Sequence, residues 1–367
     1  MALDRIRLSR FRNHAETQIT GTSRFNLLVG QNGAGKTNVL EAISLLAPGR
    51  GLRRAALPDM AGHGGDGSFA VSADLALSGA DPLKLGTGTT ADKPGRRQVR
   101  INGAESSALQ LGEWLGIFWL TPAMDRLFMD SPGARRRFMD RLVQALDPQH
   151  ARHATRADNA LRERNRLLSD PTEPDPQWLD AIEAQLAEAG AAVAMARAAL
   201  VDRLNTALAA LPPSPFARPT LAYLAGGPLS VPALASALAQ NRRRDRAAGR
   251  TLIGPQRDEL AVTMAEKNQP AAECSTGEQK AMLIAITLAH CDLASASDTN
   301  STTPRPRLLL LDEVAAHLDP LRRAALFERL GQGPAQVWMT GTEQAPFAEL
   351  GPDAACWWIA DGAVVEK

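Results

Sequence analysis

Residues 30–37 read Gly30-Gln31-Asn32-Gly33-Ala34-Gly35-Lys36-Thr37 and decide the fold class of this 367-residue chain. They match the pattern GxxxxGK[ST], and they lie between an apolar strand-like run at 24–29 and a helical pattern that continues to residue 46. In this context the glycines let backbone N–H groups wrap phosphate oxygens, and the helix N-terminus adds positive potential. The motif therefore predicts an α/β domain that holds the phosphates of a nucleotide.

Two side chains of this loop carry the expected chemistry. Lys36 is expected to contact the β- and γ-phosphates, and the Thr37 hydroxyl is expected to hold Mg²⁺. The alternative is a glycine-rich turn with an incidental lysine. A chance match in a chain of this length is on the order of one in a hundred or less, which disfavours that alternative. The predicted cofactors are ATP and Mg²⁺.

A second apolar run supplies the carboxylate that a magnesium–phosphate site needs. Residues 308–311 are consecutive leucines, the pattern of a parallel strand buried on both faces, and Asp312 and Glu313 follow them. Ligands bind at the C-terminal ends of such strands, so Asp312 is expected to hold Mg²⁺ and Glu313 to polarise the attacking water. Taken alone, the run fits a core strand with two solvated acids. The loop at 30–37 favours the catalytic interpretation.

Composition excludes several classes of protein. The 41 Lys+Arg and 40 Asp+Glu leave a net charge of +1, so the chain is not a globally basic nucleic-acid binder, although local basic patches remain possible. The three scattered cysteines support neither a disulfide framework nor a CxxC metal site. The N-terminus is charged from residue 4, and no apolar run approaches the ~20 residues of a membrane span. We expect a cytoplasmic protein with no membrane partner.

The predicted type of secondary structure changes twice along the chain. Residues 68–121 alternate as strands do, and Asn102-Gly103 is a hairpin signal. From Ser131-Pro132, a good helix start, to about residue 248 the chain reads as helical. The helix expected over 178–211 would be about 50 Å long. Strand signals return after residue 251. The prediction is one α/β domain split into 1–121 and 251–367, with a helical lobe inserted at 122–250.

A third segment sets the order of motifs along the chain. Ser275-Thr276-Gly277-Glu278-Gln279 begin an apolar helix shortly before the leucine run, and alone they are an ordinary helix cap. The order of phosphate loop, helical insertion, this segment and the Asp-Glu strand resembles the ABC-type ATPase heads of the SMC/RecF group. The resemblance implies that Ser275–Gln279 of one copy contact the γ-phosphate held by another. An ATP-dependent homodimer follows, with Asp319 in a D-loop, 316–319, that crosses the interface.

Several stretches resemble the RecF family in particular. They are 11–14 (FRNH), 36–53, 131–140, 253–259 and 275–283, and they span nearly the whole chain in order. The insertion at 122–250 is too short for the long coiled-coil arms of SMC proteins. The resemblance implies that nucleotide is contacted by Arg12, Asn13, Gly30, Gln31, Asn32, Gly33, Ala34, Gly35, Lys36, Thr37 and Asn38.

The resemblance also implies a function. RecF-like proteins are ATP-gated DNA clamps of recombinational repair. They bind duplex DNA near single-strand/double-strand junctions, help RecA loading at gaps with RecO and RecR, take part in the SOS response, and hydrolyse ATP slowly for release. Two departures bear on the hydrolysis rate: Gln256 replaces a frequent His, and the D-loop reads Ala-His-Leu-Asp where Ser-Glu-Leu-Asp is common.

Two arginine clusters in the insertion are candidate DNA contacts. A local excess of arginine can neutralise backbone phosphates, and few aromatic residues accompany it, which favours duplex over single-stranded DNA. Arginine-rich helices are also commonly solvated faces, and some of these arginines fit a contact with the partner head instead. The alternative function is therefore an ATP-dependent scaffold without direct DNA binding. The candidates are Arg135, Arg136, Arg137, Arg141, Arg242, Arg243, Arg244 and Arg246.

Overall fold

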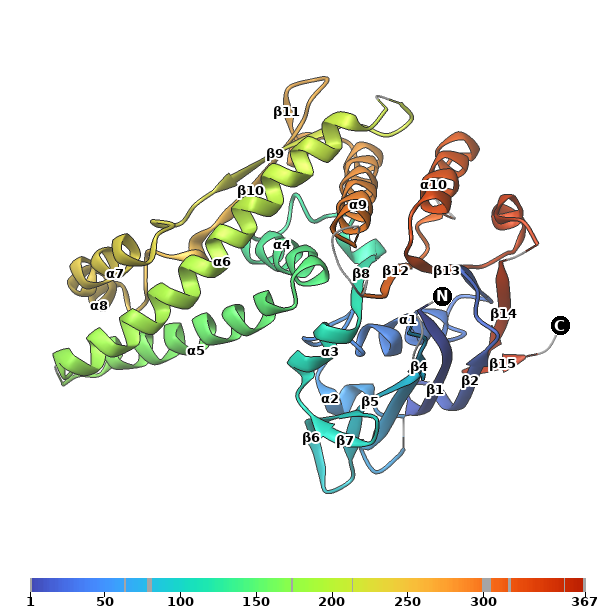
Figure 1. The fold of residues 1–367 in the computed structure, drawn as a ribbon, viewed down its shortest axis with the longest axis horizontal. Coiled ribbons are helices and arrows are strands. Elements are labelled where there is room, and N and C mark those ends of the chain that lie inside the picture. The colour runs from blue at the N-terminus through green and yellow to red at the C-terminus, as the bar shows by residue number, and fades with distance from the viewer. Residues whose placement is uncertain are drawn as a thin grey trace. The chain divides into compact units, whose positions relative to one another are not determined.

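A computed structural model describes residues 2–62, 64–77, 81–172, 174–212, 214–298, 305–315, 318–352 and 354–365. It divides into two compact units (Figure 1). Unit 1 comprises Met1–Met124 and Ala294–Lys367, and unit 2 comprises Asp125–Leu293. Residues 251–293 thus group with the inserted lobe, whereas the sequence-based boundary placed them in the α/β domain. The cause is strand pairing, because a strand at 259–264 pairs with one at 219–224.

Unit 1 contains a mainly parallel sheet in the order β15-β14-β3-β13-β12-β8. Its parallel strands are β8 (Gly116–Leu120), β12 (Arg307–Leu311), β13 (Gln336–Gly341), β3 (Phe25–Val29) and β14 (Ala355–Ala360). At one edge β15 (Ala363–Val365) pairs antiparallel with β14. The four leucines of β12 are fully buried, as the apolar run predicted. The sheet aligns the C-terminal ends of β3, β12 and β13.

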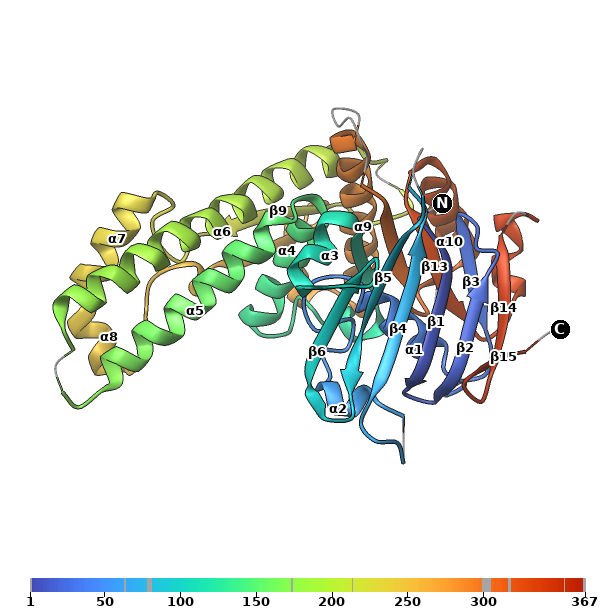
Figure 2. The same cartoon turned by 60° about the horizontal axis from the view of Figure 1, so that its bottom comes forward.

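A second sheet of unit 1 is antiparallel, in the order β2-β1-β4-β5-β6-β7 (Figure 2). Its strands are β1 (Leu3–Phe11), β2 (His14–Thr20), β4 (Phe69–Leu75), β5 (Leu83–Thr90), β6 (Lys93–Ile101) and β7 (Ala104–Ser106). Asn102 and Gly103 both have positive φ in the β6–β7 turn, as their hairpin signal predicted. The β1–β2 hairpin escaped the sequence analysis, although Leu3–Phe11 alternates buried and exposed residues.

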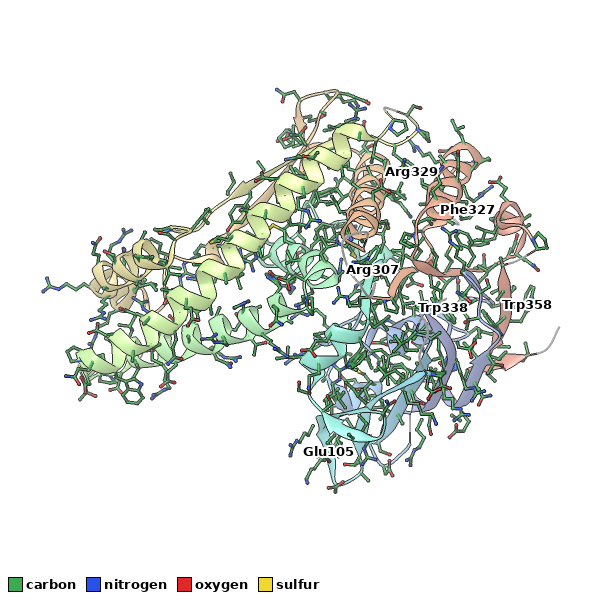
Figure 3. The ribbon with its side chains drawn as sticks, in the orientation of Figure 1. Glu105, Arg307, Phe327, Arg329, Trp338 and Trp358 are labelled. Carbon is green, nitrogen blue, oxygen red and sulfur yellow. The ribbon has the colours of Figure 1, made fainter. Side chains whose placement is uncertain are left out.

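The core of unit 1 lies between these sheets. Helix α1 (Lys36–Ser44) packs there, with Leu40 and Ile43 fully buried against residues of both sheets. Trp338 of β13 is fully buried in the same core (Figure 3). Its ring stacks on that of Trp357, with centroids 5.7 Å apart. Short helices complete the unit: α2 (Leu57–Met60), α3 (Ala108–Trp114), η1 (Pro122–Met124), α10 (Pro320–Gln332) and η5 (Ala345–Leu350).

Unit 2 is mostly helical, as the sequence predicted. Its helices are α4 (Pro132–Leu146), α5 (Gln149–Ser169), α6 (Pro176–Ala210), α7 (Val231–Gln240) and α8 (Arg242–Ala248), with η2 (Pro255–Arg257) and η3 (Ala271–Glu273). Ser131 caps α4 by accepting from the Ala134 N–H. The small sheet β11-β10-β9, with β9 (Pro219–Leu224), β10 (Glu259–Met264) and β11 (Gln269–Pro270), was not predicted. Helix α9 (Thr276–Asp298) begins in unit 2 and ends in unit 1.

Helix α6 is the long helix expected near 178–211. It contains an 18-residue window with a mean hydropathy of 1.2, which by length and composition alone would suit a membrane span. Of that window 56% is buried inside the structure. Leu186, Val193 and Leu200 face the packing of unit 2, so the apolar residues of α6 serve a protein core.

Buried ion pairs fix the helices of unit 2 to one another. Arg164 of α5 is fully buried and pairs with Glu183 of α6 at 2.9 Å and Asp245 of α8 at 2.7 Å. Arg197 of α6 pairs with Asp140 of α4 at 2.8 Å and Asp258 at 2.9 Å. Each arginine therefore joins elements that are distant in sequence.

Candidate functional site

The phosphate loop begins where buried strand β3 ends. The Gly30 N–H donates to the Gly341 carbonyl at the end of β13, with an N···O distance of 3.2 Å. A Cβ at Gly30 would lie 2.2 Å from the carbonyl oxygen of Ile359, so no larger residue fits there. At the other end of the loop Gly35 has a φ of +116° and directly precedes α1. These two glycines hold the backbone of the loop around the start of the helix.

Lys36 lies inside the loop rather than in solvent. Its side chain is buried, and Nζ donates to the carbonyl oxygens of Gly30 at 2.6 Å and Gln31 at 2.9 Å. Burial lowers the pKa of Lys36, while the negative charges of Glu313 and Asp312 oppose that shift. The ammonium is thus held at the centre of the loop, where a phosphate would replace the two carbonyl partners.

Thr37 and Asp312 meet although they are 275 residues apart in the chain. The Thr37 hydroxyl donates to Oδ1 of Asp312 at 2.9 Å, and the Thr340 hydroxyl donates to the same oxygen at 2.9 Å. Burial raises the pKa of Asp312, and the hydrogen bonds from Thr37 and Thr340 oppose it. Sequence analysis paired Thr37 with Asp312 and missed Thr340, although Thr340 is next to last in the apolar strand β13.

The donor set fits magnesium. A hydroxyl oxygen and a carboxylate oxygen lie 2.9 Å apart beside the phosphate loop, and Mg²⁺ prefers such oxygen ligands together with substrate phosphates. Elsewhere, no cluster of three or more His, Cys, Asp or Glu side chains suited to a metal occurs in the part of the chain that is described. Thr37 and Asp312 are therefore the residues that would hold the ion. Its chemistry there would be to neutralise charge on the phosphate oxygens.

Glu313 follows Asp312 and is half-buried at the end of β12. Its φ is +54°, in the left-handed region that non-glycine residues rarely adopt. Its backbone N–H donates to the Thr340 hydroxyl at 2.8 Å, so Thr340 contacts both acids. Backbone strain of this kind is common at active sites. The geometry suits Glu313 as the group that orients water.

Arg12 and Asn13 lie beside the phosphate loop, each with protein partners. Arg12 makes a two-pronged ion pair with the fully buried Glu41, both N···O distances being 2.9 Å. Asn13 donates to the Ala34 carbonyl at 3.1 Å and accepts from Asn38 at 2.7 Å. Arg53 completes the group through Glu41 and Asn38. Sequence analysis missed Glu41 and Arg53.

A buried histidine supports the loop from the β1–β2 hairpin. His14 is fully buried, with Nε2 3.1 Å from the Gly35 carbonyl and Nδ1 2.8 Å from Oγ1 of Thr17. The Thr17 hydroxyl in turn donates to the Gly362 carbonyl at 3.0 Å. Burial lowers the pKa of His14, although the backbone contacts oppose this. His14 stands in the FRNH stretch, but its role there had no sequence signal.

The turn between β14 and β15 contacts the same loop. The Gly362 N–H donates to the Ala34 carbonyl at 2.9 Å. A Cβ at Gly362 would lie 1.9 Å from the carbonyl oxygen of Asn13, and the φ of Gly362 is +75°, so glycine is required twice over. The turn and the hairpin residues His14 and Thr17 together form a support, which we call the loop support: His14, Thr17 and Gly362.

Ser275–Gln279 lie in unit 2 at the start of α9. Ser275, Thr276 and Gly277 are exposed, as a surface that contacts another molecule requires. Glu278 accepts from the Ser275 N–H at 2.9 Å and from its hydroxyl at 2.8 Å, a capping box, and also pairs with Lys267. The hydrogen bonds from Lys267 and Ser275 lower the pKa of Glu278 to about 2. Gln279 is buried, and its Nε2 donates to the Cys274 carbonyl at 2.9 Å.

Part of the expected D-loop can be placed. Asp319 caps α10 by accepting from the Arg322 N–H at 3.0 Å, and its side chain is half exposed. Leu321, two residues on, is 69% exposed. His317 lies outside the described residues. The exposed Asp319 and Leu321 leave this corner of unit 1 accessible to a partner.

Most of the candidate DNA-binding arginines have partners within unit 2. Arg135 makes a two-pronged pair with Glu259, at 2.6 and 2.8 Å, and Arg136 donates to the Asp258 carbonyl at 2.9 Å. The Arg141 guanidinium lies over the Phe138 ring, 5.4 Å from its centroid, and burial lowers the pKa of Arg141 to about 9. The contacts of Arg135 and Arg136 join α4 to residues 258–259, whereas the Arg141–Phe138 contact lies within α4.

The second cluster, residues 242–246, also contains both arginines with protein partners and exposed arginines. Arg242 pairs with Asp180 and Glu183, and Arg246 donates to backbone carbonyls of Asp170, Pro171 and Thr172. Arg243 and Arg244 are exposed, as is Arg137 in the first cluster. Among the described residues these three arginines make no hydrogen bond or ion pair. They are the members of the two clusters that are available to a partner.

Comparison with known proteins matches nearly the whole chain. Residues 2–350 match the family model described as the RecF/RecN/SMC N-terminal domain. A DNA replication and repair protein RecF from Mesorhizobium japonicum is 48% identical over 361 residues, covering 95% of this chain and 93% of the relative. The RecF protein of Rhizobium rhizogenes is 44% identical over 376 residues, covering 100% of this chain and 98% of the relative.

Solved structures share the fold. The recombination mediator protein RecF-ATP of the RecFOR pathway has a TM-score of 0.85 at 22% identity, covering 100% of this chain and 97% of that one. A RecF-ATPrS structure of the same pathway has a TM-score of 0.83 at 21% identity, covering 99% and 97%. A Smc head domain from Pyrococcus furiosus has a TM-score of 0.52. The predicted fold class, an ABC-type ATPase head with an inserted helical lobe, is confirmed.

Proposed function

Because the chain belongs to the RecF family of DNA replication and repair proteins, we propose that it is an ATP-gated DNA clamp of recombinational repair. The observation that carries the proposal is the site formed by Lys36, Thr37 and Asp312, with the Thr37 hydroxyl 2.9 Å from the Asp312 carboxylate beside the phosphate loop. A family member that retains this geometry retains the means to bind ATP and Mg²⁺.

ATP acts in this proposal as a switch between monomer and dimer. Lys36 leaves the carbonyls of Gly30 and Gln31 for the phosphates, and Thr37 and Asp312 hold Mg²⁺. Exposed Ser275–Gly277 of a second copy close over the γ-phosphate, and Asp319 lies at the same interface. Glu313 orients water for a slow hydrolysis that opens the dimer, which makes the chain a weak ATPase.

The DNA surface of the clamp includes Arg137, Arg243 and Arg244. Guanidinium groups without protein partners can bind backbone phosphates, whereas Arg135, Arg242 and Arg246 would have to break existing contacts. We expect duplex DNA, including single-strand/double-strand junctions, as the ligand. As the pathway of the similar structures suggests, RecO and RecR are the expected partners, in loading RecA at gaps and in the SOS response. Such work takes place in the cytoplasm.

The alternative is an ATP-dependent scaffold without direct DNA binding. The intramolecular partners of Arg135, Arg242 and Arg246 favour it, because those arginines stabilise unit 2 whether or not DNA is present. The clamp predicts that the positive charge of Arg137, Arg243 and Arg244 raises the affinity for DNA, whereas the scaffold predicts no effect of that charge.

Fluorescence anisotropy of a labelled gapped duplex separates the two functions. The titration is run with and without ATP and Mg²⁺, at several salt concentrations, with Lys36→Ala as the nucleotide control. The clamp predicts tighter binding with ATP, a steep loss with salt, and no ATP effect in Lys36→Ala. Arg243→Glu with Arg244→Glu should weaken binding at least tenfold, while Arg156→Glu, an exposed arginine on α5, should not. Absence of salt-dependent binding with ATP would establish the scaffold instead.

A further inference from the structure

A cavity of about 250 Å³ lies within unit 2, and none of its lining residues belongs to the phosphate loop or its partners. Two stretches that resembled the RecF family but have no part in the phosphate loop, 131–140 and 253–259, both line it. Helices α5 and α6 supply the remaining walls. The volume is slightly below the roughly 300–1,000 Å³ of sites for drug-sized ligands, so the cavity suits an occupant no larger than a single nucleotide unit.

Side chains of α5 and α6 give part of the cavity wall an apolar character. Ala157, Leu186 and Val193 are buried there, with Ala154 and Leu161 half-buried beside them. Burial of an apolar or aromatic group against these side chains would be favourable, and an inorganic ion would leave them without a partner. The occupant that fits therefore has an apolar or aromatic body.

Two guanidinium groups meet at one end of the cavity. A Cβ on Gly133 would lie 3.1 Å from Nη1 of Arg137 and 3.7 Å from Nη2 of Arg136, so both groups lie over this glycine. Arg137 has no hydrogen bond or ion pair among the described residues, and Arg136 donates through Nη1 to a backbone carbonyl. Both arginines retain donors for an anion, in the paired arrangement that suits phosphate oxygens.

The other charges of the cavity are arranged around this pair. Arg197 and Asp140 form a two-pronged ion pair, with both N···O distances 2.8 Å, and so cancel each other. Asp158 is exposed. Gln256 donates through Nε2 to the Ile253 carbonyl at 2.8 Å, which fixes its amide, and its Oε1 has no partner among the described residues. The cavity thus combines anion donors with one free acceptor for an N–H group, and the Asp158 carboxylate lies in the same lining.

We propose that this cavity binds one nucleotide unit, with the phosphate on Arg136 and Arg137 and the base against the apolar wall near Gln256. The choice of a nucleotide over another phosphate ester rests on the proposed DNA-repair function. Two sources share this chemistry: a free nucleoside monophosphate, and the terminal nucleotide of a DNA strand. The site is separate from the ATP site, because its lining residues all belong to unit 2.

Calorimetric titration of the full chain with dCMP tests the proposal. Saturating ADP and Mg²⁺ keep the phosphate-loop site occupied, and deoxycytidine and inorganic phosphate are titrated separately. We expect one dCMP per chain and at least tenfold weaker binding of either fragment, because neither uses both ends of the cavity. No dCMP binding, or dCMP binding no tighter than phosphate, would overturn the proposal.

Matched variants locate the binding in the cavity. Arg137→Gln should weaken dCMP binding about tenfold by removing one charged donor. Ala154→Phe should abolish it by filling the cavity without a change of charge. Arg156→Gln on α5 and Ala184→Phe on α6 are the controls, since both residues are exposed and neither lines the cavity. Equal effects of the cavity variants and the controls would contradict the proposal, and thermal melts confirm that each variant is folded.

Two DNA ligands distinguish the sources. One duplex carries a 5′-phosphorylated single-stranded end, and the other is closed at both ends by hairpin loops. If Ala154→Phe weakens binding of the open duplex alone, a strand end is the source. If it affects neither duplex but removes dCMP binding, the free nucleotide is the source. ATP-dependent binding of the closed duplex by the wild-type chain reports on the DNA clamp independently, so failure of one proposal does not conceal failure of the other.

Discussion

The backbone N–H of Gly362 donates to the carbonyl oxygen of Ala34 at 2.9 Å, so the turn between β14 and β15 is bonded directly to the phosphate loop. The carbonyl of the same glycine accepts from Thr17, whose Oγ1 contacts His14. The shape of the loop therefore depends on residues outside the motif that identified it.

Gly362→Ala should weaken ATP binding about tenfold or more. The new Cβ would meet the Asn13 carbonyl oxygen at 1.9 Å and must displace either the turn or the β1–β2 hairpin from the loop. Gly103→Ala is the control, because Gly103 has nearly the same φ, +82°, also follows a residue with positive φ in a strand–strand turn, and has nothing within 4 Å of the added carbon. Both variants carry a backbone cost of roughly 1–2 kcal/mol for a residue other than glycine at positive φ. Equal ATP affinity of the two variants, measured with a fluorescent ATP analogue, would show that the loop support has no role.

Glu313→Gln should leave ATP binding intact and slow hydrolysis at least about a hundredfold, since the amide cannot serve as a general base. Asp312→Asn should instead weaken Mg²⁺-dependent ATP binding, because a ligand with a negative charge is replaced by a neutral one. Phosphate release under single-turnover conditions, together with nucleotide affinity with and without Mg²⁺, separates the two roles. Similar losses of affinity in both variants would be evidence against Glu313 acting only on water.

The stability of unit 1 should decrease as the pH falls below about 6.5. Burial lowers the pKa of His14 from 6.5, so the unfolded chain binds the proton more readily than the folded one. Neutral, buried His14 therefore makes its full contribution to the free energy of unfolding above pH 6.5. That contribution is lost as the pH falls toward the pKa of His14 in the folded protein. Urea denaturation of the wild type and His14→Gln from about pH 5 to pH 8 measures this, with a shallower dependence expected for the variant. Parallel curves would assign the pH dependence to other groups.

Asp245→Ala should destabilise the chain by about 3–5 kcal/mol, because it leaves the fully buried Arg164 without one of its two carboxylate partners. Asp180→Ala removes an exposed partner of Arg242 and should cost less than about 1 kcal/mol. The free energy of unfolding in urea gives both values. If both variants lost a similar free energy of unfolding, the ion pairs of Arg164 would not be what holds α5, α6 and α8 together.

The phosphate loop and the carboxylate opposite it were predictable because their signals are local. Residues 30–37 lie in a single turn, and Asp312 directly follows a buried run of leucines. Thr340, His14, Thr17 and Gly362 were not predictable as site residues, because their partners lie far away in the chain. An isolated threonine at the end of a strand or a histidine in a hairpin carries no pattern that names a partner 20 to more than 300 residues away.

In the arginine clusters, distant partners removed a function that the local sequence predicted. A local excess of arginine predicts positive potential, but Arg135 is neutralised by Glu259, which follows 124 residues later. Arg137, two residues away, has no such partner among the described residues. In the fold, the alternation of Pro219–Leu224 was hidden by the helical composition around it, so the β9–β10 pairing that moves residues 251–293 into unit 2 was missed.

The loop support also has a consequence for the order in which the protein is made. The phosphate loop and Thr17 leave the ribosome early, whereas Gly362 is added 345 residues after Thr17. A nascent chain therefore carries the complete phosphate-binding motif long before it has the turn that holds the motif in shape. We therefore expect the affinity for nucleotide to rise only once residue 362 has been added and the turn has packed against the loop.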